Sequence, residues 1–257
     1  MATRTDYIAV FDSGLGGISV LRHLRQQMPG ERYLYFGDSA NAPYGSRSTE
    51  EVRDLTMAAA EKLLAHKPLK ALVLACNTAT AAAVKDLRQK YPSLIVIGIE
   101  PALKVAADHF PQGRIGVMAT EVTLREEKFD TLLHRFVGNC TVTKIPMPGL
   151  VQLIESGKTG GEEVEAFLRL RLADCIGKLD AVVLGCTHYP LAAEAISKVL
   201  GDGVVLLDGG AGTARETRRR LEKAGLLEEA RGELIMENSR EDPGMIALAY
   251  ELLNGER

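Results

Sequence analysis

The sequence has no long hydrophobic run and no strongly basic segment, and these absences exclude two classes of protein. No stretch approaches the roughly 20 consecutive apolar residues that cross a bilayer, and the N-terminal segment MATRTDYIAVFD lacks the apolar core of a signal peptide. The formal net charge is −3. The basic segment 215–223 contains Glu216 and Glu222, so we interpret it as the solvated face of a helix. We therefore expect a cytoplasmic protein whose partners are neither membranes nor nucleic acids.

Cysteine is also scarce. The four cysteines, at positions 76, 140, 175 and 186, have neither C-x-x-C spacing nor the density of a secreted disulfide scaffold. We expect free thiols in a reducing compartment and predict no zinc or other metal site. Cys140 and Cys175 are interpreted as packing residues, since Cys175 continues an apolar helical stripe in segment 161–177.

The sequence does have a regular alternation of short apolar runs with helical patterns. Its 257 residues, of which 46% are apolar, suffice for two lobes of roughly 100–150 residues each. The alternation predicts an α/β fold with two similar lobes, each a mostly parallel sheet flanked by helices. One lobe comprises residues 1–99 and 210–257, and the other comprises residues 100–209. The predicted strands are 7–11, 32–36, 71–75, 94–99, 114–118, 141–145, 181–185 and 204–207, and the predicted helices include 49–66, 78–90, 161–177, 210–224 and 242–254.

One stretch of the sequence occurs twice in similar form, 110 positions apart. LVLACNTATAAA (72–83) and VVLGCTHYPLAA (182–193) each run from an apolar strand into a cysteine and then into a helix-forming segment. Open α/β sheets hold ligands at the carboxyl ends of their strands, so we expect Cys76 and Cys186 on opposite walls of a cleft between the lobes. A helix N-terminus near each sulfur would favour the thiolate. The matched pair is therefore interpreted as reactive.

A fainter similarity pairs two other strand ends. IAVFDSG (8–14) and IGVMATE (115–121) place Ser13 and Thr120 in comparable positions. The glycines after Ser13 do not form G-x-G-x-x-G, because Ser19 stands where the third glycine would be, and no nucleotide site is predicted. Asp12 and Ser13 lie where a carboxylate and a hydroxyl can meet a ligand, although capping of the following helix is an alternative role.

Other polar residues adjoin the two cysteines. Asn77 and Thr78 follow the first cysteine at a predicted helix start, where an amide, a hydroxyl and backbone N–H groups can bind a carboxylate, and Thr187 repeats this arrangement after the second. His188 lies two residues after the second cysteine and can polarise its thiol or hydrogen-bond a substrate. The polar loop 36–48 permits close backbone approach at its centre, which consists of Pro43, Tyr44 and Gly45.

Two opposed thiols suit one kind of reaction. Inversion of an amino-acid α-carbon without pyridoxal or a metal needs a base that removes the proton from one face and an acid that returns a proton to the other. One cysteine must then be a thiolate and the other a thiol, with the roles exchanged in the reverse direction. No cofactor is predicted. Alternatives are decarboxylation, which needs a single base, and a non-catalytic thiol switch or regulatory module, against which the absence of C-x-x-C spacing argues.

Six motifs in consistent order resemble those of the glutamate racemases, within the Asp/Glu racemase superfamily. They are FDSGLGG, YFGDSANAPYG, LACNTATA, GIEP, IGVMAT and LGCTHYP. The resemblance implies cofactor-independent interconversion of L- and D-glutamate for peptidoglycan synthesis, by a protein with two α/β lobes around a cleft that often forms a homodimer. Racemisation of another amino acid such as aspartate is the nearest alternative, but aspartate racemases usually carry Glu where His188 stands.

The resemblance also implies roles for individual residues. Cys76 and Cys186 match the two catalytic cysteines, of which the first acts on D-glutamate and the second on the L-isomer. Asp12 matches the residue that assists the first cysteine, His188 matches the one that assists the second, and Glu155 in LVQLIESG matches an assisting glutamate. The implied substrate contacts are Asp12, Ser13, Pro43, Tyr44, Gly45, Asn77, Thr78, Thr120, Thr187 and His188.

Overall fold

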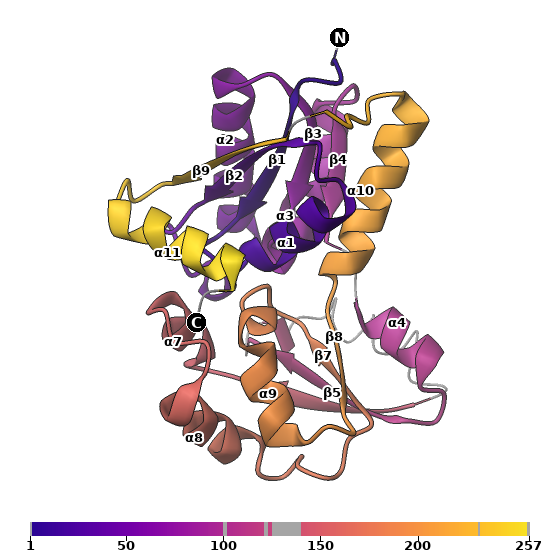
Figure 1. Ribbon diagram of the computed structural model, residues 1–257, viewed down its shortest axis with the longest axis vertical. Helices are drawn as coiled ribbons and strands as arrows, with labels where there is room; N and C mark the ends of the chain where they lie inside the picture. The colour runs from indigo at the N-terminus through magenta and orange to yellow at the C-terminus, as the bar shows by residue number, and fades with distance from the viewer. Residues whose placement is uncertain (1, 100–101, 121–122, 125–139, 231, 256–257) are drawn as a thin grey trace. The chain divides into compact units, whose positions relative to one another are not determined.

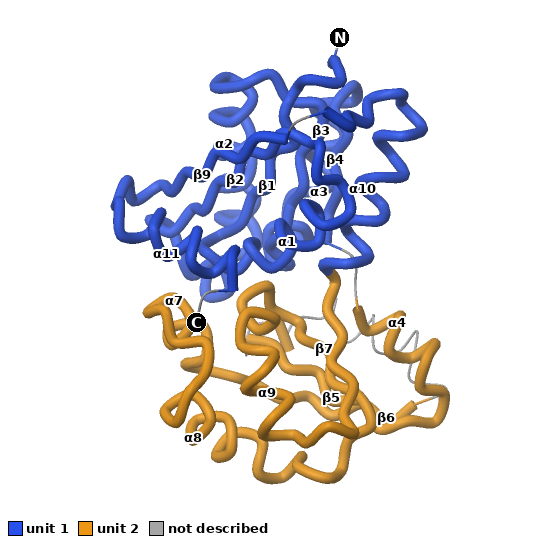
Figure 2. Tube along the Cα trace, viewed as in Figure 1, with its two compact units in different colours: residues 1–100, 210–256 blue, residues 101–209, 257 orange. Residues whose placement is uncertain are grey.

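The chain folds into two compact units. The computed structural model describes residues 2–99, 102–120, 123–124, 140–230 and 232–255. Residues 1–100 and 210–256 form unit 1, and residues 101–209 form unit 2 (Figure 2). The chain therefore leaves unit 1 once, completes unit 2, and returns to unit 1. No helix within the described ranges is long and apolar enough to cross a membrane.

Unit 1 is built on a parallel sheet. Among the described residues it has five strands in the order β4-β3-β1-β2-β9, and every neighbouring pair is parallel (Figure 1). The central strands are buried along their whole length, as expected for a parallel sheet covered on both faces. In spatial order the strands are β4 (Ile95–Gly98), β3 (Leu69–Leu74), β1 (Tyr7–Asp12), β2 (Arg32–Gly37) and β9 (Glu233–Asn238).

Helices cover both faces of this sheet. Helix α1 packs with α10 and α11 on one face, and α2 packs with α3 on the other (Figure 1). A capping box of Ser48 and Glu51 starts α2, and Asp242 caps α11 directly before Pro243. The helices are α1 (Ile18–Gln27), α2 (Thr49–His66), α3 (Asn77–Lys90), α10 (Gly210–Ala224) and α11 (Pro243–Asn254).

Unit 2 repeats this architecture on a smaller scale. In the part of the chain that the structure describes, its parallel sheet has four strands in the order β6-β5-β7-β8. Helix α4 packs on one face, while α7, α8 and α9 pack on the other. The strands are β6 (Thr141–Pro146), β5 (Arg114–Ala119), β7 (Ala181–Leu184) and β8 (Val205–Leu207), and the helices are α4 (Ala102–His109), α7 (Leu150–Glu155), α8 (Gly161–Leu172) and α9 (Ala193–Leu200).

The predicted α/β class with two parallel sheets is confirmed, with two local differences. Strand β9 was not predicted from the sequence, and it is an edge strand in which only Met236 and Asn238 are buried. Helix α8 ends at Leu172 and not at 177, because the next residues form turns in which the Cys175 N–H bonds to the Leu172 carbonyl at 2.8 Å. Cys175 nevertheless packs against the core of unit 2, and Cys140 is buried there.

The basic segment 215–223 has the predicted character. It lies on α10, where Arg219 and Arg220 both pair with Glu216, and Arg218 pairs with Glu222. The side chain of Leu221 is fully buried on the opposite side of the helix. The arginine cluster is therefore the solvated face of an amphipathic helix.

Candidate active site

The carboxyl ends of β1 and β3 bring the first group of predicted site residues together in unit 1. Asp12, the last residue of β1, is fully buried, and its Oδ1 accepts the Gly14 N–H at 2.9 Å. The next residue, Ser13, donates its hydroxyl to the sulfur of Cys76 at 3.5 Å. Parallel neighbours β1 and β3 thus place a carboxylate, a hydroxyl and a thiol at one edge of the sheet.

Cys76 occupies the N-cap of α3. It lies two residues beyond β3, and its sulfur accepts the backbone N–H of Ala79 at 3.5 Å. The partial positive charge of a helix N-terminus and these two donors favour the thiolate over the thiol. The predicted location of this cysteine at a helix N-terminus is therefore confirmed. Asn77 and Thr78, the first two residues of α3, are half-buried beside it.

Gly17 allows the loop after β1 to pack against Asp12. A Cβ atom at Gly17 would lie 2.6 Å from the Asp12 Cβ and 3.0 Å from the Ala75 Cβ, closer than side-chain atoms approach one another. Gly17 therefore permits a close approach of this loop to the carboxyl edge of the sheet. The spacing of the glycines after Ser13 indicated only that they do not fit a phosphate-binding pattern.

The loop after β2 carries the next predicted contacts. Tyr44 opens the short 3₁₀ helix η1 (Tyr44–Ser46) directly after Pro43, and its hydroxyl donates to Asp38 Oδ2 at 2.7 Å. Its ring is buried with its centroid 6.2 Å from that of Phe11. Burial, together with the hydrogen bond to Asp38, raises the pKa of Tyr44 far above its ordinary value. A ligand would therefore meet the backbone of Pro43, Tyr44 and Gly45 and not the phenol.

Unit 2 holds a chain of three titratable groups. The sulfur of Cys186 lies 3.6 Å from His188 Nδ1, and His188 Nε2 lies 2.9 Å from Glu155 Oε1. The His188 side chain is only 5% exposed and that of Glu155 is 21% exposed. An ionised Glu155 accepts the Nε2 proton, so Nδ1 accepts a proton from the thiol or, in the imidazolium form, donates to the thiolate. This geometry lets His188 set the charge of Cys186.

Close packing of two strand ends positions Cys186. Gly185 donates its N–H to the Met118 carbonyl at 2.7 Å, and a Cβ on Gly185 would lie 2.9 Å from that same oxygen. Glycine is therefore required where β7 leaves the sheet beside β5. Thr120 directly follows β5, and its Oγ1 lies 2.9 Å from that of Thr123. The same sheet edge thus carries Thr120, Cys186 and the buried Thr187.

Cys186 does not start an α-helix, and the expectation that both cysteines do is wrong for this one. The turn after it leads into the 3₁₀ helix η2 (Tyr189–Ala192), and α9 begins only at Ala193. Pro190 has no N–H. Hydrogen bonds between residues three positions apart stabilise the turn, such as the bond from the Tyr189 N–H to the Cys186 carbonyl at 3.1 Å. His188 therefore replaces a helix N-terminus as the group that polarises this thiol.

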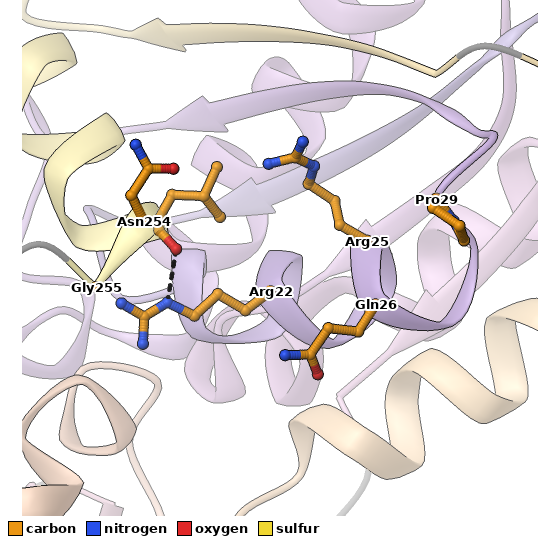
Figure 3. A pocket seen from close by; sticks show the side chains of 7 residues that line it. Arg22, Arg25, Gln26, Pro29, Asn254 and Gly255 are labelled. Carbon is orange, nitrogen blue, oxygen red and sulfur yellow. Dashed lines mark hydrogen bonds between the residues drawn. The ribbon is translucent and has the colours of Figure 1, made fainter.

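A hollow of about 450 Å³ lies elsewhere in unit 1, between α1 and α11 (Figure 3). Arg22 donates its Nε to the Leu253 carbonyl at 3.1 Å and an Nη to the Leu252 carbonyl, and so satisfies the C-terminal carbonyls of α11. None of the predicted site residues lines this hollow. Its lining residues are Arg22, Arg25, Gln26, Pro29, Leu253, Asn254 and Gly255.

Two parallel sheets, each with a polarised cysteine at its carboxyl edge, define an α/β protein equipped for thiol-based acid–base chemistry. Residues 15–217 match the family model of Asp/Glu/Hydantoin racemases. The chain is 45% identical to a glutamate racemase of Clostridium botulinum over 249 residues, which are 96% of each protein. The chain belongs to the Asp/Glu/hydantoin racemase family, and glutamate racemases are among the relatives that match it over nearly its full length.

Solved structures agree with this assignment. The crystal structure of the Thermus thermophilus glutamate racemase in complex with β-chloro-D-alanine has a TM-score of 0.81 at 38% identity, covering 97% of this chain and 94% of that one. The Escherichia coli glutamate racemase in complex with L-glutamate and the activator UDP-MurNAc-Ala has a TM-score of 0.84 at 31% identity, with coverage of 97% and 94%. Both likenesses extend over both sheets of this chain.

Proposed function

We propose that this protein is a glutamate racemase that interconverts L- and D-glutamate by two-cysteine proton transfer without a cofactor. The observation that carries the proposal is the pair of thiols, one at the carboxyl edge of each sheet, each with its own polarising groups. Decarboxylation would need only one of them. Full-length similarity to glutamate racemases supports glutamate as the substrate.

The proposed reaction exchanges one proton at each face of the α-carbon. With D-glutamate, the Cys76 thiolate takes the α-proton, which leaves a carbanion, and the Cys186 thiol donates its proton to the opposite face. Cys76 ends as a thiol and Cys186 as a thiolate, which is the state that L-glutamate requires for the reverse reaction. The enzyme needs no redox or metal step because protons and charges balance between the two sulfurs.

The neighbours of each sulfur are proposed to tune its protonation. In unit 1, Asp12 and Ser13 assist Cys76, together with the N-terminus of α3. In unit 2, His188 exchanges a proton with Cys186, while Glu155 orients the imidazole and stabilises its charged form. The carbanion is costly, so donors aimed at the α-carboxylate must offset part of its energy.

Substrate binding is assigned to polar groups at the two sheet edges. Each lies within a few residues of a catalytic cysteine or at a neighbouring strand end of the same unit. The proposal includes a homodimeric cytoplasmic enzyme that supplies D-glutamate for peptidoglycan. The assigned contacts are Asp12, Ser13, Pro43, Tyr44, Gly45, Asn77 and Thr78 in unit 1, and Thr120, Thr187 and His188 in unit 2.

A racemisation assay tests the proposal. Purified protein with no added cofactor should convert L-glutamate to D-glutamate, measured by circular dichroism, and turnover in deuterium oxide should label the α-carbon. Cys76→Ala and Cys186→Ala should each abolish conversion, whereas Cys175→Ala, at a half-buried packing cysteine, should leave it unchanged. Faster conversion of aspartate than of glutamate would contradict the substrate assignment. A fully active single variant at position 76 or 186 would contradict the two-base scheme.

A further inference from the structure

The loop that carries Tyr44 is held by the end of β9, which is remote from it in sequence. Asn238, the last residue of β9, pairs in register with Gly37 at the end of β2. Asn238 is only 7% exposed. Its side-chain amide donates to Ser39 Oγ at 2.8 Å, and its Oδ1 accepts the backbone N–H of Arg240 at 3.0 Å. The amide nitrogen and the amide oxygen of Asn238 are thus both hydrogen-bonded, and the partner of the nitrogen is Ser39 in the loop after β2.

Two residues of the turn after β9 contact the same loop. Ser239 donates its N–H to the Gly37 carbonyl at 2.9 Å and accepts the Ala40 N–H on its Oγ at 2.9 Å. Arg240 Nε donates to the Ser39 carbonyl at 3.1 Å. We call residues 238–240 the β9 clasp. It bonds Gly37, Ser39 and Ala40, and so holds the loop on both sides of Asp38.

Asp38 carries this constraint to the proposed substrate contacts. Its N–H donates to the Asp12 carbonyl at 2.9 Å. Its carboxylate accepts the Tyr44 hydroxyl at 2.7 Å and the side-chain amide of Asn41 at 3.0 and 3.1 Å. A displacement of Ser39 would therefore displace the carboxylate to which Tyr44 is attached. The backbone offered by residues 43–45 depends on that attachment.

Gly37 is tightly packed against the β9 clasp and the loop after β1. A Cβ atom on Gly37 would lie 2.5 Å from the Gly14 carbonyl oxygen and 3.0 Å from Asn238 Nδ2. The Gly14 carbonyl also accepts the hydroxyl of Tyr35 at 2.7 Å. The loop after β1, the end of β2 and the side chain of Asn238 are therefore in direct contact, so a change at Asn238 acts on the proposed binding residues of both loops.

We propose that the β9 clasp is a positioning element for the substrate site, in which Asn238 acts through Ser39 to hold the backbone of residues 43–45 ready for the ligand. This inference rests on the proposed function. A preformed loop lowers the ordering cost that a ligand otherwise meets on binding. Loss of the clasp should therefore raise KM while kcat changes little, because none of its groups touches a reacting atom.

Hydrogen exchange tests the anchoring without reference to activity. In Asn238→Ala, the amides of residues 38–42, 44 and 45 should exchange roughly tenfold faster than in the wild-type protein, because a buried hydrogen bond to the loop is lost. Ser39→Ala removes the same bond from the other side with little change in volume, and should have the same effect if Asn238→Ala folds poorly. Glu237→Gln is the matched control on the neighbouring residue, where Glu237 pairs with the exposed His66 of α2. Unchanged exchange of the loop in both clasp variants would overturn the proposal.

Kinetics then test the positioning role. Asn238→Ala and Ser39→Ala should each raise KM for glutamate roughly tenfold with kcat within about twofold of wild type, and Glu237→Gln should change neither constant. The double variant should be no worse than the poorer single variant, because both changes remove one interaction. A wild-type protein without racemase activity would refute the proposed function, and the exchange measurement would still decide the anchoring. Faster loop exchange with an unchanged KM, or additive effects in the double variant, would overturn the positioning role.

Discussion

The two cysteines follow nearly identical strand sequences, yet the structure polarises them by different means. Cys76 in unit 1 caps α3 and receives hydrogen bonds from Ala79 N–H and the Ser13 hydroxyl. Cys186 in unit 2 precedes a 3₁₀ turn and contacts His188, which is held by Glu155. A backbone N–H and a neutral hydroxyl therefore donate to the sulfur in unit 1, whereas a titratable imidazole contacts the sulfur in unit 2.

The difference shows that a repeated sequence motif need not imply repeated electrostatics. A helix N-terminus carries a permanent partial charge, so its effect on Cys76 is the same at every pH. The charge of an imidazole depends on its protonation, and the carboxylate of Glu155, 2.9 Å from His188 Nε2, favours the charged form. The pH dependence of activity should therefore report on the imidazole in unit 2 as well as on the Cys76 thiolate in unit 1. Substitution of a polarising side chain should also lower kcat/KM more in unit 2 than in unit 1, because one side chain provides most of the polarisation of Cys186.

Removal of the imidazole should have the largest effect among these polarising groups. His188→Asn should lower kcat/KM about 10²-fold, the lower end of what a general acid–base group contributes. The loss should be equal for L- and D-glutamate, because the equilibrium constant of a racemisation is one. Glu155→Gln should cost about tenfold, because the imidazole stays in place but its charged form is less stable.

The control for this comparison is His66→Asn, which removes an exposed histidine that pairs with Glu237 at 3.0 Å. Its activity should equal that of the wild-type protein. The pH profile of kcat/KM is the accompanying measurement: Glu155→Gln should shift the His188 limb to lower pH, since a lost carboxylate lowers the imidazole pKa. A profile that does not move would contradict the role of Glu155.

Loss of the hydroxyl in unit 1 should have a smaller effect. Ser13→Ala should lower kcat/KM by about two- to tenfold, the contribution of one neutral hydrogen bond, since the N-terminus of α3 and the Ala79 N–H still face the Cys76 sulfur. The acidic limb of the kcat/KM profile should move to higher pH, because a thiolate with fewer donors has a higher pKa. If Ser13→Ala lowered kcat/KM as much as His188→Asn does, side chains would provide most of the polarisation of the cysteine in both units.

A buried ion pair gives unit 1 a separate source of stability. Lys70 Nζ and Glu31 Oε2 are 2.5 Å apart with both side chains fully buried. Lys70 also donates to the carbonyls of Arg4 and Leu226, and Glu31 accepts the Glu228 N–H at 2.9 Å. The pair lies at the amino end of β3, and Cys76 follows the opposite end of the same strand.

Removal of this lysine should affect stability and not catalysis. Lys70→Met should lower the free energy of unfolding by about 3–5 kcal/mol in urea titrations, because Glu31 stays buried without its counter-charge. Burial already raises the pKa of Glu31, and a raised carboxyl pKa makes stability fall as pH rises through it. The deficit should therefore shrink at acidic pH. Lys90→Met, at an exposed pair with Glu61, should leave the unfolding midpoint unchanged. If Lys90→Met were destabilised as much as Lys70→Met, the distinction between the buried and the exposed ion pair would be refuted.

The sequence predicted the central strands well because both faces of each sheet are covered. Strands such as β1 and β3 are continuous apolar runs, and the helices between them have clear apolar periodicity. Strand β9 was missed because it is an edge strand with glutamates at positions 233 and 237 and few buried side chains. The missed strand contains Asn238, and no local pattern marks a single asparagine as the anchor of a loop about 200 residues away.

The site was predictable where its residues are neighbours in sequence. The contact of Cys186 with His188 follows from their spacing at a strand end, and the structure places them 3.6 Å apart. The contact of His188 with Glu155 joins residues 33 positions apart, and only the family resemblance indicated a role for Glu155. The Tyr44–Asp38 bond was likewise missed, because burial of the phenol depends on the packing of Phe11.

Isotope exchange in the two alanine variants tests the central claim most directly. Each enantiomer of glutamate is incubated in deuterium oxide with Cys76→Ala or Cys186→Ala, and loss of the α-proton is followed by NMR. Cys76→Ala, which retains the second thiol, should exchange only L-glutamate with retention, and Cys186→Ala should exchange only D-glutamate. Exchange of both enantiomers by either variant, or inversion in one of them, would show that the two thiols do not serve opposite faces of one carbon.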